Sequence, residues 1–161
     1  MTDLVHLRDA MADDAEQVAS IWHRGWQDGH LGHVSQRVAD ERTLASFRLR
    51  APTRIGDTRV AELDGVVVGF VMVAENEVEQ VYLLAEHRGA GLADLLMADA
   101  EARIATAGHE LAWLAVVAGN ARARRFYERR GWVDGGLVVY EAATIDGTIV
   151  VPSHRYEKVL V

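Results

Sequence analysis

Apolar residues in the first third of the chain recur at the spacing of a helix. After a short strand expected over 5–8, Ile21 and Trp22 follow Val18 by three and four residues and Trp26 follows Trp22 by four, which predicts an amphipathic helix beginning near residue 14. The range 29–32 contains two glycines and is expected to end this helix. A second helix is expected over 35–50, stopping before Pro52, because a proline disfavours helical backbone in the residue before it.

Apolar and β-branched runs then predict a group of strands. The ranges 58–63 and 66–74 are expected to form a hairpin around Asp64-Gly65, a dipeptide that tolerates the positive φ angles of a tight turn, and 78–84 is a third strand. The remaining pattern predicts a helix over 91–107, a strand over 111–117, a helix over 121–130, and strands over 138–145 and 151–160 paired through Asp146-Gly147. The order β-α-α-β-β-β-α-β-α-β-β predicts an α/β fold, a sheet with helices on its faces.

The composition narrows the classes of protein to consider. With 161 residues, no linker and no repeat, the chain is expected to form one domain over 1–161. The absence of cysteine excludes disulfides, thiolate metal sites and a cysteine nucleophile. The longest apolar run, 66–74, is too short to span a membrane, and residues 1–10 lack the pattern of a secretion signal, so a cytoplasmic location is expected. The net charge of −7 argues against nucleic-acid binding.

The loop between the strand at 78–84 and the next helix is the first candidate site. Its sequence is Arg88-Gly89-Ala90-Gly91-Leu92-Ala93. Glycine lets the backbone approach a ligand closely, and the first turn of a helix carries free N–H groups and partial positive charge, so this loop could bind a pyrophosphate. The other interpretation is a plain turn before a helix. The loop lacks the Gly-Lys-Ser/Thr of a Walker motif and the third glycine of the dinucleotide fingerprint.

A second motif lies about thirty residues further on, just after the strand at 111–117. Together with the loop pattern Arg88-x-x-Gly91-x-Ala93, it resembles the cofactor-binding motifs of the GNAT superfamily of N-acetyltransferases. The second motif is Asn120-x-x-Ala123-x-x-Phe126-Tyr127-x-x-x-Gly131-Trp132. The order and spacing of the two motifs agree with the family, as does the order of elements over 4–161. Ala90 stands where the family often has a basic residue, so only its backbone is expected to contact a phosphate.

The resemblance implies a fold and an activity. The fold is a mixed, mostly antiparallel sheet of six to seven strands flanked by about four helices. The activity is direct transfer of an acetyl group from acetyl-coenzyme A to a primary amine in a ternary complex, since no cysteine is present to carry the acyl group. The loop 88–93 is expected to bind the pyrophosphate. Asn120 would bind the pantetheine arm or cap the next helix, and Arg124 or Arg125 would reach the 3′-phosphate unless both lie on a solvated helix face. No metal is implied.

The chemistry of acyl transfer adds further candidates. The amine must be neutral, the carbonyl oxygen needs a hydrogen-bond donor, and the departing thiolate benefits from an acid. The resemblance places the acid at Tyr127, whose alternative role is a core aromatic residue, and the oxyanion donor at the backbone N–H of Leu83, on a strand that splays from its neighbour. The base is expected at Glu79, or at Glu77 on the same face of the strand, unless these carboxylates are solvated or ion-paired.

The acceptor side is left open by the sequence. By resemblance it is built around Trp26 and His30, with further candidates at Trp22, His33, Tyr140 and His154. Core packing is nevertheless the favoured interpretation of the tryptophans. Small-molecule and peptide amines both fit, and a homodimer formed through the last strands is expected from the family. The alternative function is a non-catalytic module that binds or senses acyl-coenzyme A.

Overall fold

Seven strands form one sheet in the order β1-β2-β3-β4-β5-β7-β6 in the computed structural model, which describes residues 5–144 and 147–160. Every neighbouring pair is antiparallel except β4 and β5. The predicted mixed, mostly antiparallel sheet is therefore confirmed. The strands are β1 (Val5–Asp9), β2 (Thr58–Leu63), β3 (Val66–Ala74), β4 (Glu77–Leu83), β5 (Leu111–Val117), β6 (Val133–Thr144) and β7 (Gly147–Val159).

The hairpins follow the predicted turn chemistry. Asp64 and Gly65 join β2 to β3 with φ angles of 51° and 83°, the left-handed backbone that this dipeptide tolerates. The last two strands are longer than expected. Strand β6 begins at Val133 rather than at residue 138, and β7 begins at Gly147 rather than at residue 151. Thr144 pairs with Gly147, and the expected turn residue Asp146 lies outside the described residues.

The described chain contains five α-helices rather than about four. They are α1 (Ala15–His30), α2 (Gln36–Glu41), α3 (Leu44–Arg54), α4 (Leu92–Thr106) and α5 (Ala121–Arg129). The single helix expected over 35–50 is divided because Thr43 begins a new one, its hydroxyl accepting from the Ser46 N–H at 3.1 Å. The expected stop before Pro52 was wrong. That proline is exposed inside α3, so the carbonyl that it leaves without a helical partner can be hydrated.

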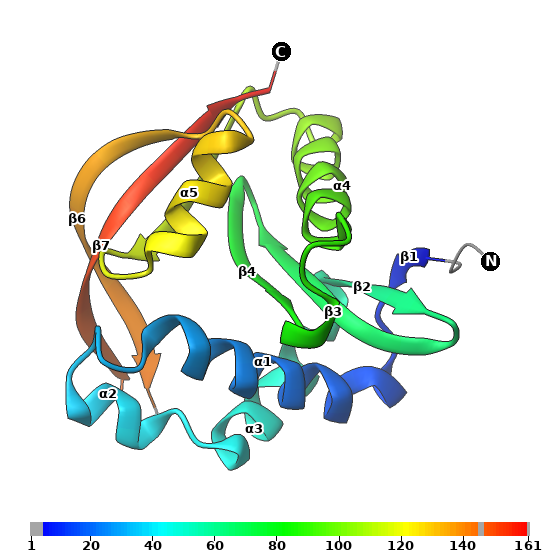
Figure 1. The fold of residues 1–161 in the computed structure, drawn as a ribbon, viewed down its shortest axis with the longest axis horizontal. Helices are drawn as coiled ribbons and strands as arrows, with labels where there is room; N and C mark the ends of the chain where they lie inside the picture. The colour runs from blue at the N-terminus through cyan, green and yellow to red at the C-terminus, as the bar shows by residue number, and fades with distance from the viewer. Residues whose placement is uncertain (1–4, 145–146, 161) are drawn as a thin grey trace.

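The helices cover the sheet in two groups. Helices α1 and α3 pack on one face, where the buried aromatic residues Trp22, Phe47 and Phe70 lie together. Helices α4 and α5 pack on the other face, over a core that contains Leu96 and Trp132. In Figure 1, α1 to α3 lie below the sheet and α4 and α5 flank β4 above it. Two separate apolar cores therefore hold β4 from opposite sides.

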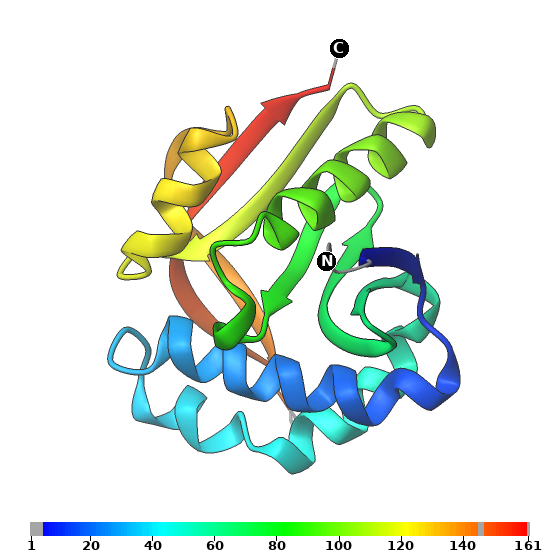
Figure 2. The ribbon, with the colours of Figure 1, turned by 45° about the vertical axis from the view of Figure 1, so that its right-hand side comes forward.

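The sheet opens at its centre, between β4 and β5. These parallel strands pair only at Glu77 and Trp113, with the Trp113 N–H donating to the Asn76 carbonyl at 3.0 Å. Beyond that point the two strands run apart, as Figure 2 shows, and α5 begins beside the gap. The predicted splay of this strand from its neighbour is present, and it leaves polar backbone groups of β4 without a strand partner on that side.

Candidate active site

A cavity of about 690 Å³ occupies the opening between β4 and β5. We call its wall of loop 88–94 and α5 the loop side. The wall formed by α1, α2 and α3 is the helix side, and residues of β6 and β7 complete the enclosure. Of the predicted site residues, thirteen line this cavity: Trp26, His30, Glu79, Leu83, Arg88, Gly89, Gly91, Leu92, Ala93, Asn120 and Tyr127, together with the further candidates Trp22 and Tyr140.

The loop side is shaped by two glycines with positive φ angles. Gly89 has φ 85°, and Gly91, the residue before the first turn of α4, has φ 82°. Nothing lies within 4 Å of where a Cβ would stand at either position, so the backbone is open to a ligand there. The free N–H groups at the start of the fifteen-residue helix α4 lie next to this opening. The geometry suits a phosphate or pyrophosphate group.

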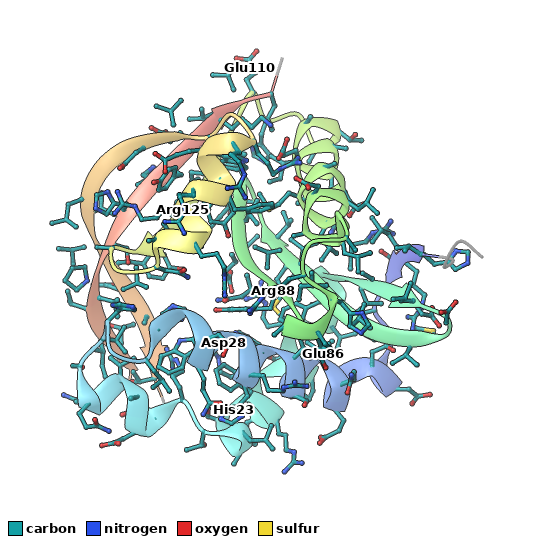
Figure 3. All side chains as sticks on the ribbon, in the orientation of Figure 1. His23, Asp28, Glu86, Arg88, Glu110 and Arg125 are labelled. Atoms are coloured by element: carbon teal, nitrogen blue, oxygen red, sulfur yellow. The ribbon has the colours of Figure 1, made fainter. Side chains whose placement is uncertain are left out.

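The side chains of the loop are directed by contacts on both sides. Arg88 donates from Nη2 to Oδ2 of Asp28 on α1 at 3.0 Å, which ties the loop to that helix, and Figure 3 shows the two side chains between these elements. Ala90 is the loop residue that does not line the main cavity. It borders a second hollow together with Val5 and Leu63.

Helix α5 presents a different arginine to the cavity from the one expected. Asn120 caps the helix, its Oδ1 accepting from the Ala123 N–H at 3.2 Å, and it also lines the cavity. Arg124 points elsewhere: its guanidinium donates to the Ala118 carbonyl at 3.0 Å and forms an ion pair with Asp134 at 3.2 Å. The structure therefore does not bring Arg124 to the cavity, and the exposed Arg125, labelled in Figure 3, does not line it either.

The arginines of α5 that do line the cavity are Arg122 and Arg129. Together with Phe126 they occupy positions i, i+4 and i+7, which is one face of a helix. Helical periodicity groups these three residues on one face, but the spacing alone does not say which face of α5 meets the cavity. The sequence prediction considered the basic character of the helix without asking which of its faces meets the loop.

Tyr127 lies at the junction of α5 with the cavity. Its side chain is 8% exposed and packs against Phe126, Trp132 and Tyr156. Burial raises the pKa of the phenol well above its usual range, so the hydroxyl stays protonated in neutral solution. The residue is therefore both a core aromatic, as the alternative interpretation held, and a protonated group on the cavity wall.

Glu79 is placed by an irregularity in β4. Met72 of β3 lies opposite Gln80, whereas Val73 lies opposite Val78, so Glu79 is an extra residue in the strand, a β-bulge. The bulge aims its carboxylate toward α3, where Oε1 accepts a hydrogen bond from Arg54. Oε2 forms no hydrogen bond within the part of the chain that the structure describes, and Glu79 lines the cavity.

Glu77 lies one step behind the cavity rather than on its wall. Its Oε2 accepts from the hydroxyl of Tyr140 at 3.1 Å, and Tyr140 itself lines the cavity. Burial raises the pKa of the Glu77 carboxyl, opposed by the hydrogen bond from Tyr140. The two carboxylates still act on each other electrostatically, but of the two only Glu79 lines the cavity.

The backbone N–H of Leu83 faces the opening between the strands. The N–H of Leu84 donates to the Val68 carbonyl of β3 at 2.9 Å. Because successive N–H groups of a strand point to opposite sides, the N–H of Leu83 points away from β3 and toward β5, which has already diverged. This N–H group therefore has no strand partner among the described residues, and Leu83 lines the cavity.

The helix side begins with a close approach of α1 to β4. A Cβ on Gly25 would stand 2.3 Å from the Tyr82 ring, and one on Gly29 would stand 2.8 Å from Nδ2 of Asn120. The two glycines, one turn apart, therefore let α1 contact both β4 and the start of α5. The sequence prediction treated Gly29 only as a helix breaker, whereas α1 continues through it to His30.

Trp26 and His30 are stacked on this side of the cavity. Their ring centroids are 4.8 Å apart with an angle of 4° between the planes, and His30 Nδ1 lies 3.0 Å from the Trp26 carbonyl oxygen. Burial lowers the pKa of His30 to about 4, so its imidazole is neutral at pH 7. Trp26 is 6% exposed, so it contributes to the core as favoured and to the cavity wall as well.

The sequence analysis missed two arginines on the helix side, Arg42 and Arg50. Arg42 follows the last residue of α2, and Arg50 lies on α3 with its guanidinium 4.5 Å from the centroid of the Trp22 ring. Neither belongs to a short motif, so local sequence gave no signal for them.

The described residues contain neither a candidate metal site nor a candidate membrane span. No group of three or more His, Asp or Glu residues there is arranged to hold a metal ion. No helix there is both long enough and apolar enough to cross a membrane.

Comparison with known proteins agrees with this geometry. The chain matches the model of the acetyltransferase (GNAT) family over residues 15–132. It is 36% identical over 81 residues to an uncharacterized N-acetyltransferase of Mycobacterium bovis, a match that covers 47% of this chain and 52% of the relative. The chain thus spans about half the length of the curated relatives it matches.

Solved structures extend the likeness to nearly the whole chain. A GCN5-related N-acetyltransferase from Rhodopseudomonas palustris superimposes with a TM-score of 0.74 at 20% identity, covering 99% of this chain and 98% of the other. A putative acetyltransferase from Salmonella typhimurium, solved with its cofactor acetyl-CoA, gives a TM-score of 0.68 at 20% identity, covering 98% and 95%. At these identities the likeness demonstrates a shared fold.

Proposed function

Because the chain belongs to the acetyltransferase (GNAT) family, we propose that it moves an acetyl group from acetyl-coenzyme A to a primary amine, in a ternary complex of enzyme and both substrates. One observation supports this most strongly. The glycine loop at the start of α4 opens onto the gap where β4 and β5 separate, so a phosphate site and a narrow slot adjoin.

The donor would bind along the loop side. The pyrophosphate of acetyl-coenzyme A would accept hydrogen bonds from backbone N–H groups of residues 89–93, with Arg88 and Arg122 adding positive charge. The pantetheine arm would lie in the slot beside β4, within reach of the amide of Asn120. In place of Arg124, we propose Arg122 or Arg129 for the 3′-phosphate, because these two arginines line the cavity.

The reacting groups would meet where β4 borders the slot. The N–H of Leu83 would donate to the thioester oxygen as the attacking amine makes that carbon tetrahedral. Tyr127 would give its proton to the sulfur of coenzyme A as the carbon–sulfur bond breaks. Its buried hydroxyl is kept protonated by desolvation, which suits an acid.

We propose Glu79 as the base that takes a proton from the acceptor ammonium, directly or through a water. Its Oε2 is available on the cavity wall, while Arg54 holds Oε1 in place. Glu77 is the weaker candidate because Tyr140 stands between it and the cavity. The acceptor remains a small-molecule or peptide amine, and a homodimer and a single domain over 1–161 remain predictions.

Release of free thiol from acetyl-coenzyme A in the presence of a panel of primary amines tests the proposal. We expect amine-dependent release with at least one amine. We also expect Glu79→Gln to lower kcat at least tenfold at unchanged acetyl-coenzyme A affinity, with a smaller loss for Glu77→Gln. Tight binding of acetyl-coenzyme A without turnover of any amine would contradict transfer and favour a binding module. Equal losses from the two variants would contradict the choice of Glu79.

A further inference from the structure

Two arginines on the helix side of the cavity stand out by their burial. Arg42 is 7% exposed, and it is the only buried arginine among the described residues. Arg50 is half-buried, with its guanidinium over the ring of Trp22. Both side chains line the cavity, beside Tyr82 and Glu79 of β4. A strongly hydrated charge placed here requires an explanation, because desolvating a cation is costly unless something pairs with it.

Neither guanidinium contacts a carboxylate within the described chain. No ion pair or hydrogen bond joins either of them to a carboxylate there, although the charge of Glu41 acts on Arg42 and that of Glu79 acts on Arg50, which also lies near the cation Arg42. The neighbouring arginines of α3 behave differently. Arg54 pairs with Glu79 and with Asp57 at 3.3 Å, and the exposed Arg48 pairs with Glu16 at 2.7 Å. Pairing is therefore the rule on this helix, and Arg50 departs from it.

The acidic groups that face the cavity do not neutralise the two arginines. Glu79 is already held by Arg54. Asp94 belongs to the loop side, where it pairs with Arg130 at 3.0 Å. Glu141 is exposed on β6, and Glu77, behind Tyr140, is not on the wall. Glu41, next to Arg42, adds one further negative charge, so three arginines (Arg42, Arg50 and Arg54) face two carboxylates (Glu41 and Glu79), and the helix side retains an excess of positive charge.

Both arginines keep their charge in neutral solution despite burial. Burial lowers the pKa of both groups, that of Arg50 to about 10, which is still far above pH 7. An oxyanion that entered this side would find two guanidinium groups with unused donors, in surroundings where charge-assisted hydrogen bonds are strong. An amine without such a group would instead bring a further positive charge beside two unpaired cations.

We propose that the acceptor is an amine that also carries a carboxylate or a related oxyanion, as an α-amino acid does, and that Arg42 and Arg50 bind this anionic group. This inference rests on the proposed function and names its substrate class. The same positive field also favours loss of the proton from the acceptor ammonium, because a nearby like charge disfavours the charged form. The donor's phosphates do not compete for this pair, because the loop side has its own arginines, Arg88, Arg122 and Arg129.

Matched amines separate this class from others. The twenty common amino acids are first screened for binding to the protein saturated with coenzyme A. Phenylalanine against phenethylamine, leucine against 3-methylbutylamine, and histidine against histamine are then compared by titration calorimetry and by thiol release. We expect at least one amino acid to bind, and to exceed the partner that lacks the carboxylate by roughly tenfold to a hundredfold in affinity. Failure of all twenty to bind, or equal or better binding of the decarboxylated partners, would overturn the inference.

Substitutions locate the preference. Arg50→Met keeps an unbranched apolar chain over Trp22. It is expected to lower the ratio of affinities for the amino acid and its decarboxylated partner at least tenfold, with acetyl-coenzyme A affinity unchanged. Arg48→Met, on the exposed face of the same helix, is the matched control and should leave the preference intact. For the more buried Arg42, the variant Arg42→Lys retains the charge and is compared with Arg42→Met, so that a folding defect can be recognised by thermal unfolding. Retention of the preference in Arg50→Met would overturn the assignment.

The two proposals fail in different ways. If no amine gives thiol release but the carboxylate preference in binding persists and is lost in Arg50→Met, the transferase proposal fails and the anion site stands. If thiol release is seen with amines regardless of a carboxylate, the transferase stands and the anion site fails.

Discussion

The two sides of the cavity are built in different ways. The loop side offers mainly backbone groups, from a continuous stretch of six residues at the start of α4, and glycine conformations create it. The helix side offers side chains from separate elements, with aromatic rings from α1 and guanidinium groups after α2 and on α3. Backbone donors can serve any ligand with phosphates, whereas a set of side chains recognises one chemical class. The first side suits a constant donor and the second a particular acceptor.

The two sides also differ in how their charged side chains are paired and exposed. On the loop side, Arg88 is paired with Asp28 and Asp94 with Arg130, whereas Arg122 and Arg129 form no ion pair among the described residues but are exposed. On the helix side, Arg42 and Arg50 also form no ion pair among the described residues, and both are partly desolvated. Tyr127 and β4 lie between the two sides, where the chemistry is proposed to occur. Substitutions can therefore disable the chemistry, the donor side or the acceptor side separately.

The largest effect is expected at the junction. Tyr127→Phe removes the proton donor and should lower kcat by about a hundredfold, with unchanged affinity for acetyl-coenzyme A. Because burial raises the pKa of Tyr127, wild-type activity should not fall through deprotonation of this phenol below about pH 10. Steady-state kinetics and calorimetry measure the two quantities.

The matched control for that variant is Tyr156→Phe. Tyr156 is a buried neighbour with its ring centroid 6.2 Å from that of Tyr127, and it is not on the cavity wall. Its loss should leave kcat nearly unchanged. A fall in coenzyme A affinity as large as the fall in kcat would contradict the role of Tyr127 as an acid.

A smaller effect, confined to the donor side, is expected from Gly91→Ala. The Cβ would strain a backbone with φ 82° and point into the space proposed for the pyrophosphate. We expect acetyl-coenzyme A to bind about tenfold more weakly, a change of about 1.4 kcal/mol in binding free energy, as measured by calorimetry. Gly108→Ala carries a similar strain, with φ 101° near the other end of α4, and should leave this affinity unchanged. Equal losses in both variants would mean that strain alone is responsible.

The smallest effect concerns the helix side and pH. The pKa of His30 is lowered by burial to about 4, so its stabilising contribution is complete above about pH 6.5 and is lost as the pH falls toward 4. Between pH 7.5 and pH 5.5, wild type should lose roughly 1 kcal/mol of unfolding free energy relative to His30→Gln. Denaturant titrations at both pH values measure this. The exposed His109→Gln is the control, and parallel pH curves for wild type and His30→Gln would contradict the prediction.

Much of the fold followed from local patterns in the chain. The hairpin at Asp64-Gly65 and the strand at 111–117 were placed correctly because turn chemistry and apolar alternation act over a few residues. The division of the helix expected over 35–50 was missed, although Thr43 is a typical capping residue. The face of α5 that meets the cavity was also missed, since it depends on what the helix packs against.

The sequence by itself determined the family, the glycine loop and the capped helix that begins at Asn120, because each depends on residues close together in the chain. Only the tertiary structure decided which charges are paired. It paired Glu79 with Arg54 and Glu77 with Tyr140, turned Arg124 toward Asp134, and left Arg42 and Arg50 on the cavity wall without an ion pair among the described residues. Burial and pairing depend on neighbours that are distant in sequence. The proposed class of acceptor therefore follows from how the helices pack and not from a short motif.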